Sequence, residues 1–226
     1  MWWNKVLLSL SFVHNKSVED LQCLLDQISQ IKPVTSEVKW TENSLLQRIL
    51  LTSVTAYAYS RQGKEEEALV TAEKAFGLLS LPQRTLFIGI THLASSLISI
   101  TAIECWRRLA EHESDLGDRA SKLVFDTTRL LKNFANKVPF AAPRAALCEG
   151  VSLCIQGKQQ EGVRHLLQTE LMAVTSNMPM ERALAIYYKC VFSSKDGAVQ
   201  DALLTESIFT SIGADYEARM AKALLY

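Results

Sequence analysis

Small residues stand at two fixed distances from three of the glycines in this sequence, Gly63, Gly157 and Gly197. Seven residues before these glycines stand Ala56, Gly150 and Cys190, and five residues after them stand Ala68, Gly162 and Ala202. Apolar residues on both sides recur at the spacing of a helix. Two antiparallel helices joined by a short turn can bring their backbones close together only where the facing side chains are small. The pattern therefore predicts tightly packed helix hairpins.

The remainder of the chain shows the same helical periodicity, and no stretch alternates cleanly enough to predict a strand. Glycine or proline follows most of the periodic segments, as expected at helix ends. We therefore predict an all-α fold, with helices at residues 2–14, 17–31, 42–62, 64–79, 83–113, 118–137, 143–156, 158–175, 180–193, 198–212 and 215–225.

The segment AYAYSRQGKEEEALVTAEKAF, residues 56–76, resembles a tetratricopeptide repeat. It has a small residue at Ala56, an aromatic at Tyr59, the turn at Gly63 and a small residue at Ala68. A second copy, EGVSLCIQGKQQEGVRHLL, keeps the small positions but has Leu153 in place of the aromatic. The resemblance implies an α-solenoid of antiparallel helix hairpins. We expect a single helical-repeat domain over residues 1–226, with divergent hairpins in 1–137 and more repeat-like hairpins in 138–226.

The second half of the chain carries a more specific resemblance, in LLKNFANKVPFAAPRAALCEGVSLCIQGK, MPMERALAIYYKC and ALLTESIFTSIGADYEARMAKALL. These segments resemble the C-terminal helical-repeat region of class III adenylate or guanylate cyclases fused to AAA-like or STAND ATPase modules. The resemblance implies a role in regulation, assembly or partner contact, with the catalytic domains N-terminal to the repeats. Neither catalytic domain is recognisable here. The Gly63-Lys64 and Gly157-Lys158 turns lack the upstream glycine and the following Ser or Thr of a phosphate-binding loop.

The sequence offers no recognisable constellation for catalysis, a cofactor or a metal. Four histidines are spread along the chain without metal-ligand spacing, and no activated nucleophile or carboxylate pair is apparent. Lys plus Arg and Asp plus Glu both number 24, so no strong field exists to attract nucleic acid. The scattered cysteines, Cys23, Cys105, Cys148, Cys154 and Cys190, predict neither disulfides nor zinc and are typical of a cytoplasmic protein. We expect a non-catalytic protein without a cofactor.

A binding surface is the functional element that the repeat pattern predicts. In tetratricopeptide-like arrays the first helix of each pair lines a concave groove that binds a protein segment, in this case a peptide or another domain of a parent signalling protein. The residues at these positions are Tyr57, Arg61, Arg144, Leu147, Val151, Leu184, Tyr187 and Val191. The alternative interpretation is that the same side chains are buried against neighbouring helices.

Residues 85–103 form a nineteen-residue stretch without a charge, long enough to cross a bilayer. A single-pass membrane anchor is therefore an alternative to the interaction module, and an all-α enzyme with an unrecognised pocket is a third. The polar and smallest residues of the stretch, Thr85, Gly89, His92, Ser96 and Ser99, form one stripe down a helix. A lone anchor would leave His92 near the middle of the bilayer without an obvious partner. We therefore favour a central helix buried in protein and consider membrane binding the weaker prediction.

Overall fold

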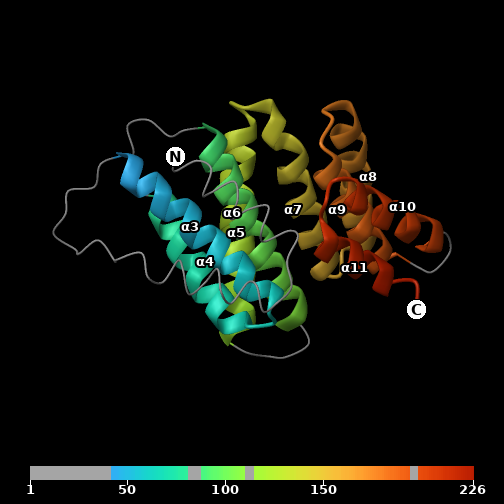
Figure 1. The fold of residues 1–226 in the computed structure, drawn as a ribbon, viewed down its shortest axis with the longest axis horizontal. Coiled ribbons are helices and arrows are strands. Elements are labelled where there is room, and N and C mark those ends of the chain that lie inside the picture. Colours follow the sequence, from blue (N-terminus) through green and yellow to red (C-terminus); the bar gives the residue numbers. More distant parts are fainter. Residues whose placement is uncertain (1–41, 81–87, 110–114, 194–197) are drawn as a thin grey trace. The chain divides into compact units, whose positions relative to one another are not determined.

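The structure is a computed structural model that describes residues 42–80, 88–109, 115–193 and 198–226 (Figure 1). All regular structure in these ranges is helical, which confirms the predicted all-α fold. The helices are α3 (Glu42–Arg61), α4 (Glu65–Leu79), α5 (Ile88–Leu109), α6 (Asp115–Ala135), the short 3-10 helix η1 (Pro139–Ala141), α7 (Ala142–Ile155), α8 (Gln159–Thr175), α9 (Pro179–Phe192), α10 (Ala198–Ser211) and α11 (Asp215–Ala223). The helices predicted at 2–14 and 17–31 lie outside the described residues.

The chain divides into two compact units, Met1–Leu123 and Val124–Tyr226, with the boundary inside α6. In the first unit, α3, α4 and α5 pack on one another. In the second, each helix from α7 to α11 packs on the next, and α7 also contacts α9. Packing between consecutive helices is the arrangement of an α-solenoid, as predicted. The predicted single domain, with divergent hairpins in 1–137 and more repeat-like hairpins in 138–226, stays a prediction.

The same helix-ending turn occurs at Gly63, Gly157, Asn177 and Gly213, each of which has a positive φ. In every case the amide of the next residue donates to the carbonyl five positions before it, as in the bonds from Lys64 to Tyr59 and from Lys158 to Leu153. This is the Schellman motif, which satisfies the last carbonyls of a helix. Glycine reaches this left-handed conformation without strain, and asparagine is the next most frequent residue there. The repeated turn explains why successive helices fold back as hairpins.

Close backbone approach at the small positions is plainest between α7 and α8. A Cβ built on Gly162 would lie 2.6 Å from the carbonyl oxygen of Gly150 and 2.3 Å from the Sγ of Cys154. Since no real Cβ tolerates such contacts, only glycine fits at position 162. At the corresponding positions of the first hairpin, Ala56 and Ala68 are fully buried. The physical reason for the small residues is therefore the one that the sequence predicts.

The second helix of each hairpin buries one stripe against its neighbours. Its members stand five and twelve residues after the glycine positions of the sequence pattern and are Ala68 and Ala75 on α4, Gly162 and Thr169 on α8, and Ala202 and Phe209 on α10. The two residues on each helix are seven positions apart, about two helical turns, which places them on one face. The three hairpins therefore share an internal register.

Helix α5 is the most deeply buried element of the first unit. Every residue from Ala94 to Cys105 is buried, so the side chains of three successive helical turns are covered on all sides. Residues 85–87 of the uncharged stretch lie outside the described residues, and the remainder forms the N-terminal two-thirds of α5. Within the described part of the chain, no helix combines the length and the apolar character needed to span a bilayer.

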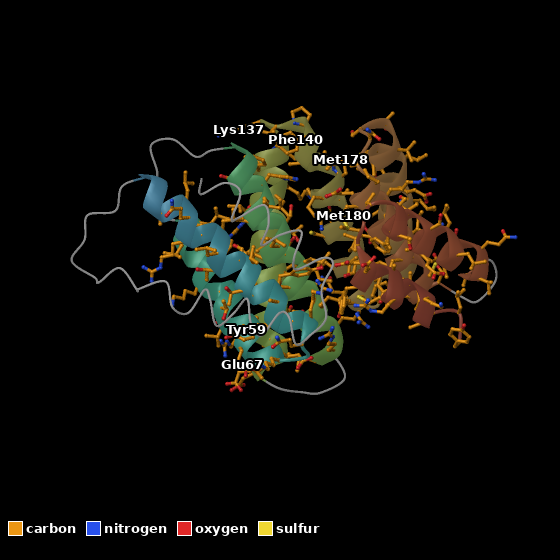
Figure 2. The ribbon with its side chains drawn as sticks, viewed as in Figure 1. Tyr59, Glu67, Lys137, Phe140, Met178 and Met180 are labelled. Atoms are coloured by element: carbon orange, nitrogen blue, oxygen red, sulfur yellow. The ribbon has the colours of Figure 1, made fainter. Side chains whose placement is uncertain are left out.

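Ion pairs join the helices of the first unit. The guanidinium of Arg108 on α5 donates to the carbonyl of Ser60 at 2.8 Å and to Glu65 at 3.1 Å, at the turn between α3 and α4. Arg119 makes a two-pronged bond to Glu73 of α4, at 3.0 and 2.6 Å. Tyr59 lies at this turn end of the α3–α4 hairpin (Figure 2), and its ring is 5.8 Å from the Lys64 ammonium. These contacts fix α5 and the start of α6 to the first hairpin.

Candidate functional site

The side chains predicted to line a groove lie mostly in the interior of the structure. Tyr57, Arg61, Arg144, Leu147, Val151, Leu184 and Tyr187 are buried, and Val191 is half-buried. The arginine at position 61 lies over the ring of Tyr57, with 5.8 Å between its Cζ and the ring centroid. In this arrangement the side chains serve helix packing, the alternative that the sequence leaves open. Binding of a partner by this set stays a prediction.

Arg144 and Glu181, from α7 and α9, form a buried ion pair. The Nη2 and Nε of Arg144 donate to the same carboxylate oxygen at 2.7 and 3.2 Å. Burial opposes the charged form of Arg144, but the field and the hydrogen bonds of Glu181 more than offset it and raise the pKa of the guanidinium above its usual range. Because both side chains are buried, each charge depends on the other as its counter-charge. The pair holds the two helices in register.

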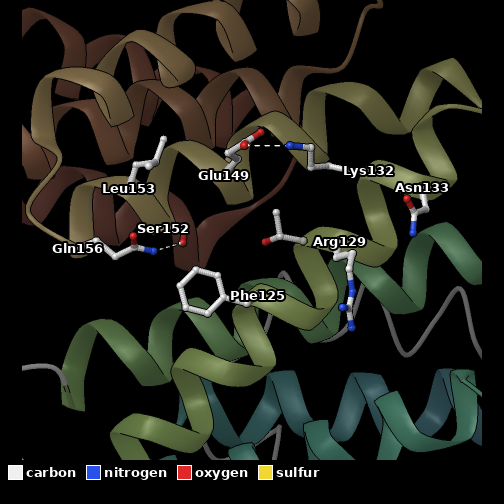
Figure 3. A pocket seen from close by; sticks show the side chains of 9 residues that line it. Phe125, Arg129, Lys132, Asn133, Glu149, Ser152, Leu153 and Gln156 are labelled. Carbon is white, nitrogen blue, oxygen red and sulfur yellow. Dashed lines mark hydrogen bonds and ion pairs between the residues drawn. The ribbon is translucent and has the colours of Figure 1, made fainter.

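A pocket of about 380 Å³ lies between α6 and α7, wholly within the second unit (Figure 3). It takes its walls from one face of each helix and combines polar, charged and apolar side chains. Those from α6 are Phe125, Thr128, Arg129, Lys132 and Asn133, and those from α7 and its C-terminal cap are Glu149, Ser152, Leu153 and Gln156. This pocket is the candidate functional site, and we call it the α6–α7 pocket.

An ion pair closes one end of the α6–α7 pocket. The Lys132 ammonium donates to Glu149 at 2.9 Å and so joins the end of α6 to the middle of α7. The other carboxylate oxygen of Glu149 lies 4.0 Å from the Nδ1 of His165 on α8. Lys132 lies near the end of the α6 lining and contacts Glu149, the first residue of the α7 lining, so the two faces run antiparallel. Phe125 therefore faces Gln156 at the opposite end of the pocket, as Figure 3 shows.

The middle of the pocket presents two buried hydroxyl groups. Ser152 accepts a hydrogen bond from the amide of Gln156 at 3.1 Å, which leaves its own hydrogen available. The Oγ1 of Thr128 is buried and finds no hydrogen-bond partner among the described residues. Thr127, by contrast, donates to the carbonyl of Val124 at 3.1 Å. A buried hydroxyl without a partner costs free energy.

The lining has more hydrogen-bond donors than free acceptors. Arg129 is largely exposed, and its Nη2 donates one hydrogen bond to Asp126 at 2.9 Å. Most of the five N–H donors of its guanidinium therefore remain available. Asn133 and the hydroxyls add further donors, whereas the carboxylate of Glu149 is already engaged by Lys132. The half-exposed ring of Phe125 supplies apolar surface. Chemically, the pocket can hold a group that accepts hydrogen bonds beside an apolar one.

Three cysteines of the described helices have thiols with raised pKa values. Burial raises the pKa of Cys105 to about 12 and that of Cys154 and Cys190 to about 11, so these thiols remain protonated near neutrality. Throughout the described ranges, His, Cys, Asp and Glu side chains nowhere gather in threes as a metal ion would need.

A second surface is apolar and lies on α8, on the side opposite to its buried stripe. Leu167, Leu171 and Val174 follow each other at steps of four and three residues, and Leu171 is 71% exposed. The structure shows no partner element over these side chains among the residues that it describes. These residues do not line the α6–α7 pocket, so they can serve as control positions in experiments on it.

Sequence reasoning missed the α6–α7 pocket, although its signal is present. The lining residues of α6 recur at steps of three, one, three and one, and those of α7 at three, one and three, which is one face of each helix. The face of α7 that the sequence analysis predicts to line a groove, with Arg144, Leu147 and Val151, is not the face that lines the pocket. Periodicity shows which residues share a helix face, but it does not show that a face with both polar and apolar residues lies opposite a face of another helix.

Comparisons with known proteins add no identification. No protein family, no curated protein and no solved structure matches the chain.

Proposed function

We propose that this chain is a non-catalytic, cytoplasmic helical-repeat module that binds a segment of another protein in the α6–α7 pocket. The observation that carries the proposal is the pocket itself, about 380 Å³ in volume and open on one face of an antiparallel helix pair. Pockets of this size that mix apolar surface with a few polar groups are the usual form of a binding site. The Lys132–Glu149 ion pair links its two walls.

Packing on both sides of α7 supports a preformed site. The α7 helix is held to α8 by the Gly150–Gly162 approach and to α9 by the Arg144–Glu181 pair. A wall that is already rigid loses little conformational freedom on binding, which favours affinity. A peptide segment that inserts one or two side chains between the helices would fit such a pocket.

We further propose that the module belongs to a signalling protein related to the class III cyclases fused to AAA-like or STAND ATPases. The resemblance of residues 130–225 supports this parentage. The genomic sequence upstream of Met1 tests it, because an in-frame cyclase or ATPase domain is expected there. Cyclase and ATPase assays on the isolated chain should give no turnover, and robust turnover in either would refute the non-catalytic proposal.

Site-specific photo-crosslinking in the native cells tests the binding function. A benzophenone amino acid replaces Gln156 or Asn133 at the pocket, and Leu171 on the apolar surface of α8 in the control. Both pocket positions should crosslink to the same protein, at the same site on that protein, and the control should not. Crosslinks that are absent from both pocket positions, or equally abundant at Leu171, would refute a binding role for the pocket.

A further inference from the structure

We infer that the α6–α7 pocket selects an acidic peptide segment, in which a carboxylate side chain stands next to a large apolar one. The inference rests on the proposed function, because it assumes that the pocket binds a protein segment. It goes further by assigning the chemistry that the pocket recognises. The assignment follows from the charges, the donors and the apolar surface of the lining.

The charge of the lining favours a carboxylate. Arg129 and Lys132 are cationic and Glu149 is the single anion, so the lining carries one net positive charge. Lys132 engages Glu149 at 2.9 Å with one of its three N–H groups. Arg129 uses one N–H toward Asp126. Both cations therefore keep N–H groups for a ligand, and a planar guanidinium is suited to a carboxylate.

The neutral polar groups of the lining can also donate hydrogen bonds to an acceptor on the ligand. Ser152 accepts from Gln156 and has its own hydrogen to donate. The Asn133 amide, at the rim near Lys132, adds two N–H donors. A basic ligand side chain would compete with Lys132 for the carboxylate of Glu149, the single anion of the lining.

The apolar part of the ligand is expected at the other end of the pocket. Phe125, 47% exposed, and Leu153 provide apolar surface there, while the ion pair lies at the Glu149 end. A peptide segment that carries both kinds of side chain can therefore occupy both ends. Nucleic acid is disfavoured because the whole chain has no net positive charge and the pocket has a single aromatic ring on which a base could stack.

Selection from a phage library of random 12-residue peptides on the purified full chain is the first experiment. Enriched peptides should pair Asp or Glu with an adjacent Phe, Leu or Trp. The strongest binder is then made with a fluorescent label, and its acidic residue is replaced by Gln or Lys. Fluorescence anisotropy should show at least about a fivefold loss of affinity for the Lys peptide, with the Gln peptide in between.

The Glu149→Gln variant separates recognition from a structural role. It releases Lys132 from its ion pair and removes the one anion of the lining. Loss of an interhelical contact alone would weaken binding of any peptide, whereas the inference requires the acidic peptide to bind about two- to fivefold more tightly. Glu206→Gln on α10 makes the same change in net charge outside the pocket lining and should leave the affinity unchanged. Arg129→Gln should weaken the acidic peptide and spare the Lys peptide.

The outcomes distinguish the two levels of the proposal. Enrichment of neutral or basic peptides that compete at the pocket would overturn the acidic selectivity and leave the binding function standing. An affinity for the acidic peptide that falls in Glu149→Gln would also overturn it. Failure to enrich any peptide above a control selection without the chain would overturn both.

Discussion

Replacing Gly162 by alanine is the most direct test of the close packing between α7 and α8. The added Cβ would lie 2.3 Å from the Sγ of Cys154, 2.6 Å from the carbonyl oxygen of Gly150 and 2.8 Å from the backbone nitrogen of Cys154. Two of these three atoms belong to the backbone and cannot rotate away. Ordinary contacts begin at about 3.4 Å, so α7 and α8 would have to separate by most of an ångström.

The expected change in the free energy of unfolding has the opposite sign to that of an ordinary replacement of glycine by alanine in a helix. Alanine in a helix is favoured over glycine by about 0.5–1 kcal/mol, because glycine loses more backbone freedom on folding. Overpacking a well-filled interface costs about 1–3 kcal/mol. With three contacts below 3.0 Å the steric cost dominates. We therefore expect Gly162→Ala to lower the free energy of unfolding by about 1–2 kcal/mol.

Urea denaturation followed by circular dichroism at 222 nm measures this change, and hydrogen exchange locates it. Amides of α7 and α8 should exchange faster in the variant. Gly77→Ala on α4 is the matched control, because a Cβ there meets no atom within 4 Å, and it should raise stability by about 0.5–1 kcal/mol. Gly150→Ala, whose Cβ contacts are 3.1 Å, should fall between the two.

A Gly162→Ala variant that is as stable as the wild-type chain, or more stable, would refute the close-approach argument. The same conclusion would follow if Gly162→Ala and Gly77→Ala changed stability in the same direction. Faster exchange confined to helices other than α7 and α8 would contradict the assigned location.

Three other predictions concern buried polar groups. Glu181→Gln should cost about 3–5 kcal/mol in urea denaturation by leaving Arg144 without its buried counter-charge, and the double change Arg144→Met with Glu181→Leu should cost much less. Thr128→Val should raise thermal stability by about 1 kcal/mol, because it removes a buried hydroxyl that lacks a partner among the described residues. The raised pKa of Cys105 stabilises the fold fully below the ordinary thiol value of 9.0, and this contribution is lost as the pH rises toward 12. By pH 10.5 the loss amounts to about 2 kcal/mol, so a Cys105→Ala variant should show a smaller decline between pH 8.5 and 10.5; equal declines would contradict the assignment.

Local chemistry made much of the fold predictable. Helix ends follow from glycine and proline, and the small residues around Gly63 and Gly157 reveal which helices turn back on each other. The fourth Schellman turn, at Asn177, was harder to foresee, because asparagine also occurs in many other conformations. Residues 94–103 of the uncharged stretch are buried in α5, as the sequence predicts for a central helix.

The candidate site depended on information that is not local. The sequence by itself determined that α6 and α7 are helices, where they end, and which residues of each share a face. It could not determine which face meets which neighbour, because that choice depends on the summed packing of all the helices. Tertiary structure buried Arg144, Leu147 and Val151 of the predicted groove and paired the first of them with Glu181, 37 positions along the chain. The same packing turned the face of Glu149 toward Lys132 and left a pocket between the two helices.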